Sequence, residues 1–146
     1  MTGILRAAAD YDAGMDKIRA GLEARSELLV EEKHTAPRIG SGKVHVLATP
    51  VMINVIEAAA LAAVEDLLPQ GFQSLGTVLN VRHIAATPVG MKITARAEVT
   101  GVEGRTIRFR VEVHDEKDLI GDGTHERVVV NVAKFDERVQ RKLKVE

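Results

Sequence analysis

Three residues of this chain have side chains that could act together on a carbonyl group: Thr49, Glu57 and His83. His83 lies in the stretch GTVLNVRHIAATPVGM, residues 76–91, where strand spacing places it in phase with apolar side chains. We therefore expect His83 to face covered space. Because imidazole titrates near neutral pH, a covered histidine is either a satisfied core residue or a group that moves protons.

Glu57 lies within the apolar segment PVMINVIEAAALAAVEDLL, residues 50–68, which has the longest helical pattern of the chain. A carboxylate among apolar neighbours is costly unless it is paired, hydrogen-bonded or partly wet. The residues alone leave two interpretations open. Glu57 is a general base in a covered site, or it shares the one solvated strip of the helix with Asn54.

Thr49 directly precedes Pro50, an order typical of the N-cap and first position of a helix. As an N-cap, Thr49 would satisfy a free backbone N–H; its alternative role is a hydroxyl nucleophile or a group that hydrogen-bonds substrate. Thr49 and Glu57 are eight residues apart. On an ideal helix this separation is about 12 Å of rise and about 80° of rotation. Both can act on one carbonyl only if the segment around Thr49 bends back or a second subunit supplies one of them.

The other candidates carry weaker signals. Gly76 could let a substrate approach the backbone and offer its N–H to an oxyanion, or it could simply start or bulge a strand. Arg127 could bind a phosphate or a carboxylate, although a strand arginine is more often solvated. We expect His114 and His125 at the surface. The histidines show no metal-ligand spacing with carboxylates, so no metal is predicted. The GSGK sequence at 40–43 lacks the spacing and the serine or threonine of a P-loop, so it does not predict a phosphate-binding loop.

Composition narrows the class of protein. The chain has 146 residues, 45% of them hydrophobic and 28% charged, which suits one globular domain. Its net charge of −1 gives no electrostatic footprint for nucleic acid or a membrane surface, and an aromatic content of 3% argues against base stacking. Cysteine is absent, and the sequence shows neither a signal peptide nor an uncharged run of membrane-spanning length. A cytoplasmic location is expected.

The elements that must position the candidate residues are one helix and a sheet. Strand patterns follow the long helix in regular alternation with short turns, which is typical of an antiparallel meander. The expected elements are a helical N-terminal extension over 1–24, a strand over 26–33, a Pro- and Gly-containing loop over 34–50, strands over 93–99, 107–113 and 124–133, and a charged surface helix or frayed tail over 136–146. The predicted fold class is α+β, a long helix wrapped by an antiparallel sheet, and the sheet edges favour a dimer.

Three blocks carry a family resemblance: ATPVMINVIE (48–57), SLGTVLNVRHIAATPVGM (74–91) and IGDGTHERVVV (120–130). In this order they resemble the fluoroacetyl-CoA thioesterase family of hotdog-fold enzymes, and the match spans roughly residues 25–142. The resemblance implies a single hotdog domain over 25–146 and a homodimer or larger assembly with active sites at the subunit interface. The implied reaction is hydrolysis of an acyl-CoA to a carboxylate and free CoA, with no cofactor because CoA is part of the substrate.

Carried over residue by residue, the resemblance implies that Thr49, Glu57 and His83 are catalytic, and that Gly76 and Arg127 bind substrate. Members selective for fluoroacetyl carry phenylalanines in the lid before the catalytic threonine, whereas residues 36–47 of this chain read APRIGSGKVHVL, without an aromatic. A different small acyl group is therefore expected. The alternatives are a non-catalytic acyl-CoA-binding or sensing protein, and a hotdog hydratase or dehydratase, which would need an Asp/His pair not identified here.

Overall fold

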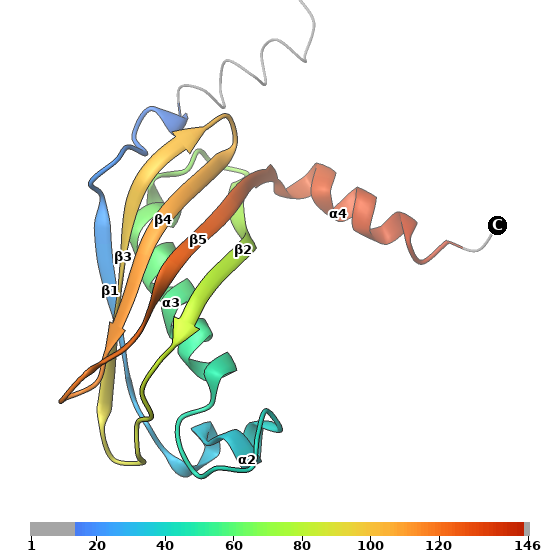
Figure 1. Cartoon of the computed structure of the whole chain (residues 1–146). Coiled ribbons are helices and arrows are strands. Elements are labelled where there is room, and N and C mark those ends of the chain that lie inside the picture. The colour runs from blue at the N-terminus through green and yellow to red at the C-terminus, as the bar shows by residue number, and fades with distance from the viewer. Residues whose placement is uncertain (1–13, 145–146) are drawn as a thin grey trace, which may run out of the picture.

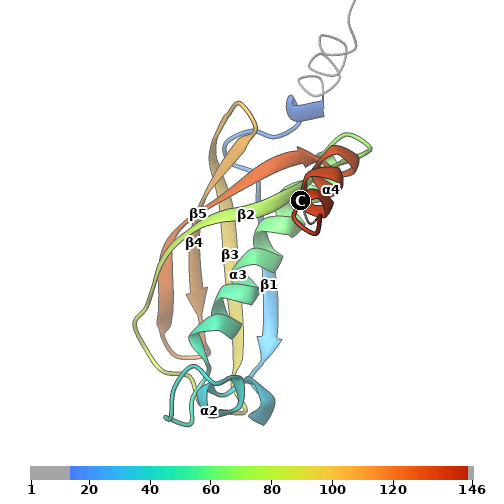
Figure 2. The same cartoon turned by 90° about the vertical axis from the view of Figure 1, so that its right-hand side faces the viewer.

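Five antiparallel strands curl around one long helix in the computed structural model, which describes residues 14–144 (Figures 1 and 2). Hydrogen bonding places the strands in the order β1-β3-β4-β5-β2, with every pairing antiparallel. The elements are β1 (Glu23–Leu29), a 3-10 turn (Glu32–His34), α2 (Ala36–Ile39), α3 (Thr49–Val64), a second 3-10 turn (Glu65–Leu67), β2 (Phe72–His83), β3 (Lys92–Glu103), β4 (Thr106–His114), β5 (Leu119–Asn131) and α4 (Val132–Arg141). The predicted α+β class is confirmed.

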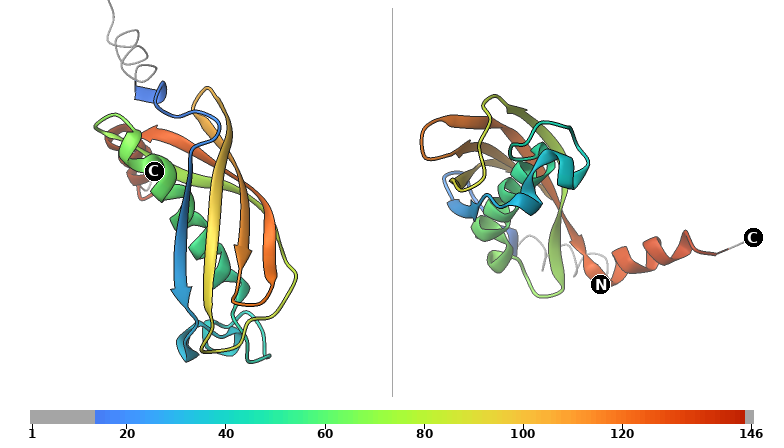
Figure 3. Two further views of the ribbon diagram at one scale, coloured as in Figure 1. Left: turned by 90° about the vertical axis from the view of Figure 1, so that its left-hand side faces the viewer. Right: turned by 90° about the horizontal axis from the view of Figure 1, so that it is seen from below.

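Helix α3 is the centre of the core. It packs mainly against β1 and β3, and Figure 3 shows the sheet wrapped along its length. The composition explains this burial, because apolar residues occur almost all the way round the helix. The buried residues of α3 are Met52, Val55, Ile56, Ala59, Ala60, Ala63 and Val64. Asn54 and Leu61 lie on the strip that the sheet leaves exposed.

The start of α3 differs from the prediction by one residue. Ala48, not Thr49, is the N-cap, and no side chain caps this end. The carbonyl of Ala48 accepts hydrogen bonds from the backbone of Val51 and Met52. Its own N–H donates to the carbonyl of His34, which fixes where the chain enters the helix. Helix boundaries predicted from sequence are commonly off by one or two residues. The hydroxyl of Thr49 is consequently free of a capping role.

Strands β3 and β4 follow the predicted alternation. Their inward side chains are almost completely buried: Ile93, Ala95, Ala97 and Val99 in β3, and Ile107, Phe109, Val111 and Val113 in β4. The outward positions carry charges that pair across the sheet, as Arg110 does with Glu98 at 2.6 Å. This division between faces is the pattern of an antiparallel sheet with one wet side.

Strand β2 lies at the edge of the sheet and pairs with β5 alone among the described strands. Its apolar residues Leu75, Val78 and Leu79 are 39%, 41% and 38% exposed. An apolar edge strand is prone to pair with another chain. The strand ends at His83, so the second half of the 76–91 stretch is loop. His83 was predicted to face covered space, and in a single chain it is only half-buried.

The terminal elements differ from the predictions in their boundaries. The first strand runs over Glu23–Leu29 rather than 26–33, and the following loop contains the short helix α2. Helix α4 begins at Val132 rather than 136, because the side chain of Asn131 accepts a hydrogen bond from Lys134 N and caps it. Most of the predicted N-terminal extension, residues 1–13, lies outside the described part of the chain. No helix within residues 14–144 is long and apolar enough to cross a membrane.

Candidate active site

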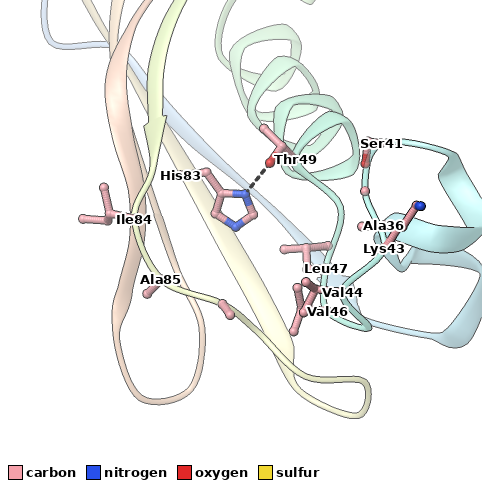
Figure 4. Close-up of a pocket in the computed structure, with 12 residues that line it drawn as sticks. Ala36, Ser41, Lys43, Val44, Val46, Leu47, Thr49, His83, Ile84 and Ala85 are labelled. Atoms are coloured by element: carbon pink, nitrogen blue, oxygen red, sulfur yellow. Dashed lines mark hydrogen bonds between the residues drawn. The ribbon is translucent and has the colours of Figure 1, made fainter.

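Thr49 and His83 form a hydroxyl–imidazole pair at one end of the fold. Thr49 is the first residue of α3 and His83 the last residue of β2, and their Oγ1 and Nδ1 atoms are 2.7 Å apart (Figure 4). The sequence predicted that His83 would be held by a partner or used for chemistry, and the partner is a hydroxyl. A hydroxyl at hydrogen-bond distance from a neutral imidazole is the arrangement of a nucleophile with its base.

His83 is suited to accept a proton. Burial lowers its pKa below the ordinary value of 6.5, so the neutral form prevails at neutral pH. Nε2 of this ring is buried without a hydrogen-bond partner among the described residues. In the tautomer with its proton on Nε2, the ring accepts the Thr49 hydroxyl proton at Nδ1. Nε2–H is then a donor directed away from Thr49.

A pocket of about 350 Å³ opens beside this pair. Its lining residues are Ala36, Ser41, Gly42, Lys43, Val44, Val46, Leu47, Thr49, His83, Ile84, Ala85 and Ala86. The segment before α3 forms the wall opposite His83, as Figure 4 shows. Lys43 is the one lysine or arginine of this lining, and no phenylalanine, tyrosine or tryptophan contributes to it. The pocket is large enough for a small acyl group.

Glu57 belongs to a second group of polar residues near the middle of α3. Its Oε2 accepts a hydrogen bond from Arg127 Nη1 at 3.1 Å. Arg127 is 4% exposed, whereas the Glu57 side chain is 35% exposed. Gly76 faces the same carboxylate: a Cβ at this position would lie 2.6 Å from Glu57 Oε2. Gly76 thus provides the space that the Glu57 carboxylate occupies.

Sequence reasoning missed three polar residues of this group. Arg127 Nε donates to Ser74 Oγ at 2.8 Å, and Ser74 Oγ donates to Glu65 Oε1 at 2.6 Å. His125 was expected at the surface, which is wrong: it is fully buried, and its ring stacks on Phe109 with centroids 5.7 Å apart. His114, by contrast, is exposed as predicted.

A strand signal for the buried side of β5 was present in the sequence. His125, Arg127 and Val129 alternate with Glu126 and Val128, so the period of two places the first three on one face. Val129 is fully buried, and His125 and Arg127 share its side of the strand. This buried face of β5 was not recognised from the sequence, because histidine and arginine are usually exposed.

The structure brings the five candidate residues into two groups. Thr49 pairs with His83, while Glu57 contacts Arg127 and approaches Gly76. No hydrogen bond joins the two groups within the described residues. Eight residues along α3 amount to about 12 Å of rise, which is too far for both groups to contact one carbonyl. Within residues 14–144, no cluster of three or more histidine or acidic side chains has metal-binding geometry.

Comparison with known proteins places this arrangement in context. A family model described as fluoroacetyl-CoA-specific thioesterase matches residues 30–133. The chain is 45% identical over 97 residues to a fluoroacetyl-CoA thioesterase of Streptantibioticus cattleyicolor, covering 66% of this chain and 70% of that protein. A solved structure of a variant of the fluoroacetyl-CoA thioesterase FlK, in complex with acetyl-CoA, superposes with a TM-score of 0.81 at 35% identity, covering 87% of this chain and all of that one (100%). A hot-dog-like protein from Thermanaerovibrio acidaminovorans shares the fold, with a TM-score of 0.82 at 22% identity and coverage of 90% and 98%.

Proposed function

The chain belongs to the fluoroacetyl-CoA-specific thioesterase family, and from this membership we infer that it hydrolyses a small acyl-CoA thioester to a carboxylate and free CoA. It has the hotdog fold of its structural relatives and is a thioester hydrolase. The observation that carries the proposal is the Thr49–His83 pair at 2.7 Å beside a pocket of about 350 Å³. A protein that only binds or senses acyl-CoA has no need of a hydroxyl paired with a neutral imidazole.

Each candidate residue has a role that its surroundings support. As Thr49 Oγ1 attacks the thioester carbonyl, His83 takes the hydroxyl proton and passes it to the departing CoA sulfur, so that the acyl group is held as an ester on Thr49 until water hydrolyses it. Glu57, held by Arg127, acts as the base toward water on the other side of the carbonyl. The N–H of Gly76 polarises the carbonyl oxygen. Water is added across the C–S bond, so that the acyl group leaves as a carboxylate and the sulfur as the CoA thiol.

We propose that two subunits complete the site. α3 is a regular helix from Thr49 to Val64, so the segment at Thr49 does not bend back toward Glu57. The alternative left by the spacing is a second subunit. The exposed apolar edge strand β2 supplies a surface for it, and β2 carries Gly76 in its middle and His83 at its end. A dimer paired through β2 would place the Thr49–His83 pair of one protomer beside the Glu57 group of its partner.

The acyl group is proposed to be small and not specifically fluoroacetyl. The lid segment from Ala36 to Leu47 contributes part of the pocket lining and contains no phenylalanine, tyrosine or tryptophan. An aromatic wall gives a small substrate a large rigid contact surface, which this lid does not offer. The cytoplasmic location and the absence of a cofactor remain predictions from the sequence.

A thiol-release assay over short, medium and aryl acyl-CoAs tests the proposal. We expect release from at least one short acyl-CoA and a large loss of rate in Glu57→Gln and His83→Ala. His114→Ala and Glu137→Gln are matched controls, because both side chains are exposed and outside the two groups. No release from any thioester, together with measurable CoA binding, would favour the sensing alternative. Equal rates in wild type and both site variants would show that the site is assigned wrongly.

A further inference from the structure

The Arg127 guanidinium makes four hydrogen bonds within the protein, out of its five N–H groups. Its Nε donates to Ser74 Oγ at 2.8 Å, and its Nη2 donates to the backbone carbonyl of Ser74 at 3.1 Å. Its Nη1 donates to Glu57 Oε2 and lies 3.2 Å from Nε2 of His125. Contacts on all three nitrogens fix both the position and the plane of the guanidinium.

The contacts of His125 determine its tautomer. Nδ1 lies 2.7 Å from the carbonyl oxygen of Val78, which only accepts hydrogen bonds. Nδ1 therefore carries the proton and donates it. Nε2 is then the acceptor for Arg127 Nη1. A neutral His125 thus holds one side of the guanidinium and is itself fixed by β2 and by stacking on Phe109.

Ser74 holds the other side of the guanidinium. Its hydroxyl accepts from Arg127 Nε and donates to Glu65 Oε1, and its backbone N–H donates to Glu65 Oε2 at 2.9 Å. Glu65 is in the 3-10 turn that directly follows α3. The path from Glu65 through Ser74 and Arg127 to Glu57 therefore begins and ends on the same helical segment.

We propose that Ser74 and His125 are positioning residues of the reaction, because they hold Arg127 in the one orientation that places the Glu57 carboxylate over Gly76. The inference depends on the proposed function, since it assigns these residues to the thioesterase site. The distribution of burial supports it: Ser74, His125 and Arg127 are 5%, 0% and 4% exposed, whereas the Glu57 side chain is 35% exposed. Ser74, His125 and Arg127 are thus shielded from solvent, and the Glu57 carboxylate is accessible to it.

A purely structural network would have a different energetic character. Burying an arginine is costly, and a well-packed apolar group is often as stable as a buried ion pair. Among the described residues, Glu57 is the one ionic partner of Arg127. The buried Arg127 guanidinium therefore does more to orient the partly exposed Glu57 carboxylate than to stabilise the fold. Such support is expected where the orientation of a reacting group matters.

A double-mutant cycle tests the proposal in the full-length protein. We expect Ser74→Ala and His125→Phe each to lower kcat at least about tenfold while KM changes less than about twofold, because a small displacement of a reacting group is sufficient for such a loss. In the Glu57→Gln background, Ser74→Ala should change the residual rate less than about twofold, since its effect acts through Glu57. Thr100→Ala is the matched control, because it removes an exposed threonine hydroxyl on β3, outside both groups and away from β2.

An NMR readout makes the test independent of turnover and of whether one variant fails to fold. In wild type, the Nε–H of Arg127 should exchange slowly with solvent, and Ser74→Ala or His125→Phe should accelerate its exchange, with Arg127→Lys used to assign the signal. Equal loss of rate from Ser74→Ala in both backgrounds would overturn the proposal, as would fast exchange in wild type. If wild type hydrolyses no thioester, the proposed function fails, and the exchange data alone decide whether Ser74 and His125 hold Arg127.

Discussion

Replacing Gly76 by alanine should displace the Glu57 carboxylate without unfolding the protein. The new Cβ would lie 2.6 Å from Glu57 Oε2, closer than real Cβ atoms approach any neighbour. The carboxylate would have to move by about 0.8 Å to reach van der Waals separation. A displacement of this size at a reacting group lowers the rate by about 30- to 100-fold. Gly76 has no positive φ, so alanine introduces no backbone strain.

The assay is thiol release at saturating acyl-CoA, with thermal unfolding measured in parallel. We expect kcat to fall by about 30- to 100-fold, KM to stay within about threefold, and the free energy of unfolding to change by less than about 1 kcal/mol. Gly101→Ala is a matched control: it also lies at a register irregularity of the sheet, lacks a positive φ, and its Cβ would meet nothing within 4 Å. A Gly76→Ala variant with the kcat of wild type would refute the role assigned to the Glu57 position.

Three further predictions concern the other parts of the fold. Thr49→Ala should lower kcat at least about tenfold and Thr49→Ser should retain most of it, because the hydroxyl that pairs with His83 is kept; equal rates would exclude that hydroxyl from the reaction. Burial lowers the pKa of His83 and of His125 below 6.5, so the folded state binds fewer protons than the unfolded state once the pH falls below about 6.5. The urea midpoint of unfolding should therefore be steady above about pH 6.5 and fall below it, with a smaller fall in His125→Phe. A urea midpoint that does not change with pH would contradict this. Gly123→Ala should lower the melting temperature sharply, because its Cβ would lie 2.1 Å from the carbonyl oxygen of Asn80 on β2; an unchanged melting temperature would mean that β2 and β5 pair in another register.

Local patterns predicted the framework of the fold well. The alternation in β3 and β4 and the apolar helix each have a single physical reading, because the buried face is chemically distinct from the wet one. Element ends were less predictable. The start of α3 is set by a long-range hydrogen bond from Ala48 N to the carbonyl of His34. The local Thr49–Pro50 pattern cannot predict this hydrogen bond.

The candidate site was only partly predictable for a similar reason. His83 was found because an apolar pattern surrounds it, and Glu57 because an apolar helix contains it. His125 was misplaced because its burial depends on Phe109 and on the carbonyl of Val78, which lie on neighbouring strands. The period of two in β5 does place His125 on the same face as Val129, but the Val78 carbonyl that satisfies Nδ1 of its ring lies on another strand, and only the folded geometry identifies it.

The central claim is that the Thr49–His83 pair and the Glu57 group form one thioesterase site across two subunits. Mixing Thr49→Ala with Glu57→Gln protein under conditions of subunit exchange tests it most directly. Random exchange should restore about a quarter of the wild-type thiol-release rate, because about half of the dimers are mixed and each of these has one intact site. If mixed dimers are present by mass spectrometry and the rate stays at the level of the parent variants, the two groups do not meet across subunits and the account is wrong.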